Sequence, residues 1–167
     1  NQWFVFLKKS EKWSLEELEN YQLKKLKELI SVAIDHSPFY SSKFQELNIN
    51  KATIETLEDI SQLPIVSKKE LIKHNRAIQN ENFKGKCFIA STSGTSGESL
   101  KFNRNESSDS FNRAAIFRGY SWFQVRPWDR NGFFWGYDFS KKELLKISIL
   151  DSLQNRFRLF NFNKQQQ

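Results

Sequence analysis

Ser91–Ser99 is the stretch whose residue types and spacing are best suited to chemistry. It runs Ser-Thr-Ser-Gly-Thr-Ser-Gly-Glu-Ser and contains no apolar side chain. Its two glycines, Gly94 and Gly97, permit positive φ angles, so that successive backbone N–H groups can converge on one anion. The hydroxyls add donors that rotate toward phosphate oxygens. The pattern predicts a polyphosphate-binding loop, and a flexible Ser/Gly linker is the alternative interpretation of the composition alone.

The spacing excludes two familiar kinds of loop. Gly94 and Gly97 are too close together for a Walker A loop, and no Gly-Lys-Ser/Thr follows them. The G-x-S-x-G spacing of a nucleophile elbow is also absent.

The residues on either side of this loop predict two strands that turn back on each other. Lys86–Ala90 has the composition of a short strand, and Leu100–Asn103 alternates like a returning strand. Farther along, we expect a helix over 111–122, a buried strand over 132–137 and a poorly patterned helix over 140–160. Pro127 sets the limit of the first of these helices.

The first 84 residues predict a helical segment. Ser14 with Glu17, and Ser67 with Glu70, have the spacing of capping boxes that open helices. Pro38 ends the first of these helices, because proline disfavours the α conformation in the residue before it. Shorter helices are expected over 39–47 and 54–60, from apolar residues at helical spacing.

These elements together predict a mixed α/β fold. Residues 1–84 would form a helical N-terminal segment, and residues 85–167 the start of an α/β nucleotide-binding core that carries the phosphate loop at 91–101. The whole would be a single, incomplete domain. The absence of any Met, and a Gln-rich end without a closing signal, lead us to expect a fragment of a longer protein.

Composition and charge narrow the functional classes. With 38% hydrophobic residues the chain can build a core, and it has no apolar run long enough to span a membrane. The net charge of +7 is uneven, because residues 86–167 hold 13 basic and 7 acidic side chains. This half would attract an anion such as a nucleotide, coenzyme A or nucleic acid. The residues of a candidate basic face are Arg104, Arg113, Arg118, Arg126 and Arg130, and ordinary solvated charge is the alternative.

No metal site is predicted, because His36, His74 and Cys87 match no metal-binding spacing. We expect Cys87 to be buried on its strand rather than to act as a nucleophile, since no histidine lies near it in sequence. A single cysteine, without export signals, favours a reducing compartment and a cytoplasmic location.

Ser93–Ser99 resembles the signature loop of adenylate-forming enzymes, whose usual form is Ser-Gly-Thr-Thr-Gly-x-Pro. The likeness is closest to the phenylacetate–coenzyme A ligase branch, including its capsule-polysaccharide and coenzyme F390 synthetase-like members. Further segments resemble that branch in the same order along the chain. They are Trp13–Leu26, Ser37–Phe44, Leu63–Leu71 and Arg118–Asp129.

This resemblance implies that the parent protein joins a carboxylate to the α-phosphate of ATP and releases pyrophosphate. The acyl group would then pass to a thiol, usually that of coenzyme A, and Mg²⁺ would accompany the triphosphate. Tyr137 becomes a candidate for the acyl pocket, and a position in the aromatic core is the favoured alternative. The residues implied to bind the phosphates are Thr92, Ser93, Gly94, Thr95, Ser96, Gly97 and Lys101.

The sequence also departs from the family's pattern. Ser99 stands where the family usually has proline, and Leu100 stands where many relatives have lysine. Lys101 lies one step later, where a strand presents its opposite face. The family's remaining nucleotide contacts and its catalytic lysine would lie beyond residue 167, so we expect the chain alone to bind ATP poorly and to lack catalysis.

The resemblance also suggests a setting in surface-polysaccharide assembly and a homodimer. Two other functions remain open. One is a basic module that binds nucleic acid or protein, with the Ser/Gly stretch as a linker. The other is an inactive product of a decayed gene, which the reading frame on both sides would reveal.

Overall fold

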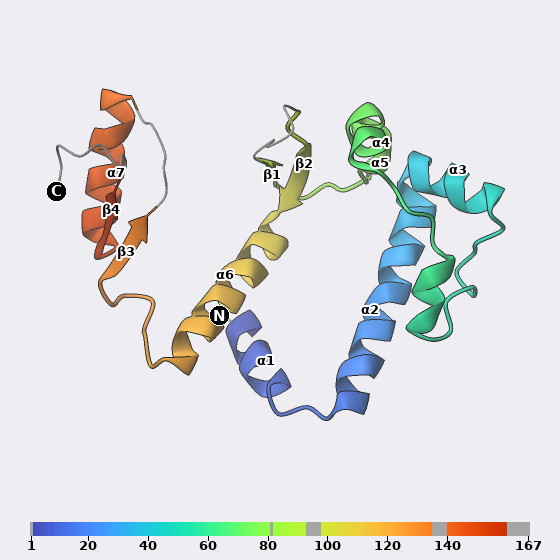
Figure 1. The fold of residues 1–167 in the computed structure, drawn as a ribbon, viewed down its shortest axis with the longest axis horizontal. Coiled ribbons are helices and arrows are strands. Elements are labelled where there is room, and N and C mark those ends of the chain that lie inside the picture. The colour runs from blue at the N-terminus through green and yellow to red at the C-terminus, as the bar shows by residue number, and fades with distance from the viewer. Residues whose placement is uncertain (1, 81, 93–97, 135–139, 160–167) are drawn as a thin grey trace. The chain divides into compact units, whose positions relative to one another are not determined.

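The computed structural model describes residues 2–80, 82–92, 98–134 and 140–159 (Figure 1). The chain divides into two compact units, Asn1–Ala114 and Ala115–Gln167. No helix within the described ranges has both the length and the apolar character needed to cross a membrane. The first unit contains the helices that precede the hairpin, the hairpin that carries the predicted phosphate loop, and the first part of the helix that follows it.

The helices of the first unit begin where the sequence places hydroxyl caps. Ser14 and Glu17 form the predicted capping box, as do Ser67 and Glu70. Ser37 ends one helix and caps the next, and its hydroxyl donates a hydrogen bond of 2.7 Å to the carbonyl of Ile78. The helices are α1 (Gln2–Ser10), α2 (Leu15–His36), α3 (Pro38–Glu46), α4 (Lys68–Lys73) and α5 (Asn75–Ile78).

The prediction of a helix over 54–60 is wrong. The structure has only a short 3₁₀ helix here, η1 (Glu58–Gln62). The carboxylate of Asp59 accepts hydrogen bonds from the backbone N–H groups of Glu55 and Thr56, at 2.9 and 2.8 Å. These bonds stabilise a turn in place of a helix. Ile54 therefore enters the core as a single residue rather than as part of a helical stripe.

The core of the first unit lies between α2, α3 and the segment that follows α3. Ile54 is its most buried member, with 1% of its surface exposed. It packs in one cluster with Ile30 of α2, Phe44 of α3 and Ile49. Leu23, Leu26 and Ala33 flank this cluster, as the helical spacing predicts for one face of α2.

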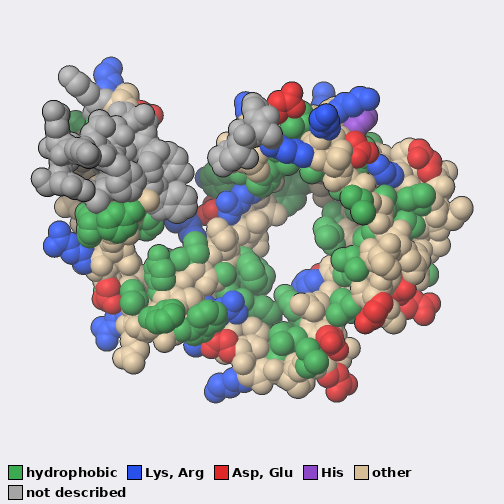
Figure 2. Space-filling model, in the orientation of Figure 1, with side chains coloured by type: hydrophobic (Ala, Val, Ile, Leu, Met, Phe, Trp, Pro, Cys, Tyr) green, Lys and Arg blue, Asp and Glu red, His purple; other side chains and the backbone are tan. Residues whose placement is uncertain are grey.

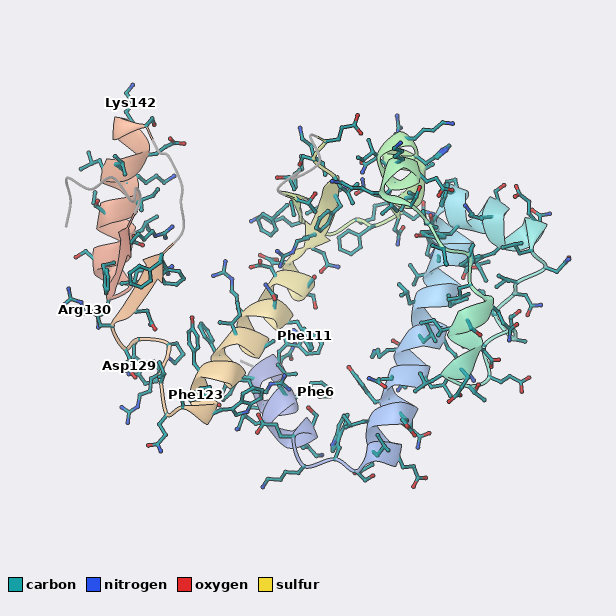
Figure 3. The ribbon with its side chains drawn as sticks, viewed as in Figure 1. Phe6, Phe111, Phe123, Asp129, Arg130 and Lys142 are labelled. Atoms are coloured by element: carbon teal, nitrogen blue, oxygen red, sulfur yellow. The ribbon has the colours of Figure 1, made fainter. Side chains whose placement is uncertain are left out.

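A second, aromatic cluster gathers around α1. Phe6 packs edge-on against Trp13 and also contacts Tyr21 of α2, with ring centroids 5.5 and 5.3 Å apart. Trp3 meets Phe111 edge-on at 5.3 Å. Figure 3 shows Phe6 and Phe111 with the neighbouring rings. These contacts fix α1 to α2 and to the start of the helix that follows the hairpin.

The predicted hairpin is present. Strands β1 (Cys87–Ser91) and β2 (Lys101–Asn105) pair antiparallel, with Cys87 opposite Asn105 and Ser91 opposite Lys101. Helix α6 (Glu106–Trp122) follows β2 directly, so it begins five residues before the expected position. Asn105 explains the early start, because its side-chain oxygen accepts a hydrogen bond of 2.7 Å from the backbone N–H of Ser108.

The second unit contains a parallel strand pair joined by a helix (Figure 1). Strand β3 (Asn131–Phe134) pairs with β4 (Arg156–Leu159), and α7 (Lys141–Leu153) connects them. The expectation of helix through residue 160 is therefore wrong beyond Leu153. Strand β3 is also less buried than predicted, because Phe134 has 60% of its surface exposed.

Candidate phosphate-binding hairpin

Hydrogen bonds join the two ends of the predicted phosphate loop. We call the residues that form them, Thr92, Ser99 and Leu100, the neck of the hairpin. The backbone N–H of Thr92 donates to the carbonyl of Leu100 at 2.9 Å, and the N–H of Leu100 donates to Thr92 Oγ1 at 3.1 Å. Ser99 Oγ donates to the carbonyl of Thr92 at 2.7 Å. Three hydrogen bonds therefore extend the pairing of β1 and β2 beyond the strands themselves.

The predicted site residues fall into two groups. Thr92 lies exposed at the neck, and Lys101 lies exposed at the first position of β2, opposite Ser91. Leu100, beside Lys101, is half-buried. The predicted residues that lie outside the described ranges are Ser93, Gly94, Thr95, Ser96, Gly97 and Tyr137.

Two side-chain amides hold the outer edge of β2. Gln79 Oε1 accepts a hydrogen bond of 3.0 Å from the backbone N–H of Asn103, and Asn75 Nδ2 donates to the carbonyl of Lys101. Gln79 Nε2 in turn donates to Asn75 Oδ1 at 3.0 Å. We call Asn75 and Gln79 the amide clasp. It satisfies backbone groups of β2 that face away from β1, as a third strand would.

Sequence reasoning missed the amide clasp. The only local signal is two amide residues four positions apart, which places them on one side of a helical turn. That signal is common on protein surfaces and does not indicate a partner.

A cavity of about 610 Å³ beside the clasp is lined by Asn75, Arg76, Gln79, Asn80, Phe83 and Asn103.

The predicted basic face is partly neutralised where it adjoins the hairpin. Arg104 of β2 and Arg113 of α6 both pair with Asp109, at 3.2 and 2.8 Å. The hydrogen bond from Arg113, followed by the charges of both arginines, lowers the pKa of Asp109 below its usual value. Neither arginine therefore presents an isolated positive charge.

His36, His74 and Cys87 were considered as metal ligands from the sequence, and the structure gives each of them a different setting. Among the residues that the structure describes, no three His, Cys, Asp or Glu side chains form a group that would hold a metal ion. His36 lies 3.3 Å from the side-chain amide of Asn82, and the ring of His74 packs 5.2 Å from that of Phe39. Cys87 is exposed, so the expectation that it is buried is wrong. Its strand has only one position, Ala90, that is even partly covered.

Comparison with known proteins identifies the fold. No protein-family model matches the sequence, and no curated protein matches it. A crystal structure of 2-hydroxyisobutyryl-CoA ligase, in its postadenylation state with 2-HIB-AMP, is similar over 89% of this chain, with a TM-score of 0.61 and 20% sequence identity. The chain spans 32% of that ligase. The predicted mixed α/β fold is thereby confirmed, and it corresponds to part of the fold of that ligase.

Proposed function

We propose that this chain is part of an ATP-dependent, AMP-forming ligase that activates a carboxylic acid as an acyl-adenylate and transfers it to coenzyme A. The fold likeness to an acyl-CoA ligase supports the reaction class. The sequence resemblance alone supports the phenylacetate-like branch, the surface-polysaccharide setting and the homodimer. The proposed cytoplasmic location rests on the single cysteine and on the lack of an export signal in the given sequence. Because the chain spans about a third of the similar ligase, the activity belongs to the whole polypeptide.

The neck of the hairpin is the observation that carries this proposal. Thr92 is bonded to Leu100 and Ser99, which holds both ends of the Ser/Thr/Gly segment together. A segment anchored in this way can present its N–H and hydroxyl donors in a fixed arrangement. Donors fixed before the reaction stabilise developing charge better than donors that must reorganise during it.

In the proposed reaction, a substrate carboxylate oxygen attacks the α-phosphorus of ATP. The bond between that phosphorus and the bridging oxygen to the β-phosphate breaks, and pyrophosphate leaves with the electron pair. Thr92, Ser93, Gly94, Thr95, Ser96 and Gly97 would hold the β- and γ-phosphates as this charge develops, and Lys101 would contribute a positive charge at the neck. The thiol sulfur of coenzyme A then bonds to the acyl carbon, AMP leaves, and the thiol proton passes to solvent.

The amide clasp supports the hairpin on which the loop is carried. Asn75 and Gln79 bond to the backbone of β2 on the edge opposite β1, so the hairpin is held from both sides. Among the described residues no three His, Cys, Asp or Glu side chains cluster, so none of these residues is assigned as a Mg²⁺ ligand.

The test is pyrophosphate release by the polypeptide that contains this chain together with the flanking sequence of its reading frame. A panel of carboxylic acids serves as substrate. We expect Thr95→Ala combined with Ser96→Ala to lower kcat/KM by about 10- to 100-fold, since each removes a transition-state donor. The matched control is Ser107→Ala with Ser108→Ala, which removes two exposed hydroxyls of α6. If the loop variant released pyrophosphate at the same rate as the parent protein, the loop would not be the phosphate-binding element.

The linker interpretation makes a different prediction. A flexible linker between 91 and 99 would be cut by a protease at the same rate with or without ATP. A phosphate loop in the same polypeptide should instead become protected as ATP is added. Equal cleavage under both conditions would favour the basic binding module.

A further inference from the structure

The second unit contains a pocket that the proposed ligase function does not use. Its volume is about 440 Å³, and it lies where the two parallel strands begin and α7 ends. Three arginines line it, together with one acid, Asp151. We call Arg130, Arg156, Arg158 and Asp151 the arginine pocket.

The backbone brings two of these arginines together. The N–H of Asn131 donates to the carbonyl of Asn155 at 3.2 Å, so Arg130, just before β3, and Arg156, just after Asn155, belong to neighbouring strand ends. Asn155 has a left-handed φ of 49°, which asparagine tolerates well. Its side-chain amide donates to the carbonyl of Trp128 at 3.1 Å. The mouth of the pocket is therefore fixed by hydrogen bonds.

Asp151 forms ion pairs with two of the three guanidinium groups, closely with Arg158 and more loosely with Arg156. Asp151 is 5% exposed, and its Oδ1 accepts a hydrogen bond of 2.9 Å from Arg158 Nη2. Its Oδ2 lies 2.7 Å from Arg158 Nε as part of the same ion pair. Arg156 Nε is 3.7 Å from Asp151, beyond hydrogen-bonding distance. Three arginines and one aspartate leave this lining with a net charge of +2.

The two remaining arginines keep donors for a ligand. Arg130 lies over the ring of Phe157 at 5.6 Å, and Arg156 over the ring of Phe133 at 5.3 Å. Within the described residues, neither guanidinium donates a hydrogen bond to a carboxylate. The acid next in sequence, Asp129, accepts a hydrogen bond of 2.7 Å from the backbone N–H of Arg126.

Figure 3 shows Arg130 at one end of this unit and Lys142 at the other end. Lys142 lies near the start of α7. In Figure 2, blue side chains mark both of these ends. The carbonyl end of a helix carries a partial negative charge and disfavours an anion. Two guanidiniums in excess of the carboxylate reverse that sign at the arginine pocket.

We propose that the arginine pocket binds a phosphate monoester. A planar guanidinium matches the geometry of phosphate oxygens, and a doubly charged phosphate balances the surplus charge of the lining. The phosphate could belong to a small metabolite or to the end of a nucleic acid, and both would present the same group. The site lies in the second unit and does not depend on the function proposed for the hairpin.

The first test is calorimetric titration of the 167-residue chain with inorganic phosphate at low salt. We expect saturable binding with a Kd of about 1 mM or tighter. Arg130→Gln and Arg156→Gln should each weaken binding by about five- to tenfold, because each removes charge-assisted hydrogen bonds. Lys142→Gln, with the same loss of charge at the opposite end of α7, should change the Kd by less than about twofold.

Two further arms complete the test. Thermal unfolding checks that each variant remains folded, and Arg130→Gln alters an exposed side chain that lies outside the ion pairs of Asp151. Thr95→Ala with Ser96→Ala shows whether phosphate binds the hairpin instead. An oligonucleotide with a 5′-phosphate, compared with one without, separates a nucleic-acid end from a small metabolite.

The proposal is overturned by absence of saturable binding, or by equal weakening in Lys142→Gln. It is also overturned if binding is lost in the hairpin variant and kept in Arg130→Gln. An oligonucleotide that binds equally with and without its 5′-phosphate would show attraction of the phosphodiester backbone and would likewise refute a monoester site.

Discussion

Gln79 and Asn103 are joined by a hydrogen bond of 3.0 Å from the backbone N–H of Asn103 to the side-chain oxygen of Gln79. The two residues are 24 positions apart, and they connect the end of α5 to the outer edge of β2. Because β2 also forms one side of the neck, this bond links the helical segment to the candidate phosphate loop.

Gln79→Ala should loosen the hairpin. The variant leaves the N–H of Asn103 without its protein acceptor and removes the bond between Gln79 and Asn75, at a cost of about 1 kcal/mol per bond. Hydrogen exchange at Asn103 should accelerate accordingly. The control is Gln45→Ala, an exposed glutamine of α3. Unchanged exchange at Asn103 would show that the clasp does not hold β2 in solution.

Glu70 should titrate far below an ordinary glutamate. The hydrogen bond from Lys43 Nζ, at 2.8 Å, is the main cause, and hydrogen bonds from Ser67 add to it, so that the pKa of Glu70 falls from 4.5 to about 2. The stabilisation from this lowered pKa is fully present above about pH 4.5 and is lost as the pH falls toward 2.

Lys43→Gln should therefore raise the pKa of Glu70 toward 4.5, as followed by NMR of its side-chain carboxyl carbon. It should also reduce the stability measured in urea at neutral pH, with a smaller difference from the parent chain in acid. Lys69→Gln removes an equal charge from an exposed position of the same helix as Glu70. A shift of equal size in that control would assign the effect to net charge rather than to the ion pair.

Ile54→Ala should destabilise the first unit by about 2–4 kcal/mol, because it opens a cavity in a packed core. Ile54 is 1% exposed and contacts the cluster of Ile30, Phe44 and Ile49. Ile65→Ala makes the same chemical change at a residue that is 95% exposed, and its effect should stay within about 0.5 kcal/mol. Urea denaturation measures both variants, and similar losses in the two would contradict the assigned core.

Cys87 should react with a thiol reagent in the folded chain. Its side chain is exposed at the first position of β1, so one thiol per chain should be modified without denaturant. The same reaction in urea supplies the reference rate for a fully accessible thiol. If the thiol reacted only after unfolding, Cys87 would be buried in solution, as the sequence led us to expect.

Short sequence patterns were sufficient to predict the features that depend on neighbouring residues. Ser14 with Glu17 and Ser67 with Glu70 cap helices through bonds that span three residues. The strands on either side of the Ser/Gly segment also follow from local composition, as does the mixed fold class that they imply. Each of these can be recognised within a short window, because the interacting groups are close along the chain.

Contacts between residues that are distant along the chain depend on how the elements pack in space. The turn around Asp59 overrode the helical spacing of 54–60, and pairing with β3 made a strand of Arg156–Leu159. Gln79 finds Asn103, and Arg130 finds Arg156, only when separate elements are placed side by side. Hydrogen bonds and charges act over a few ångströms in space, whatever the distance along the sequence, so no local pattern contained these contacts.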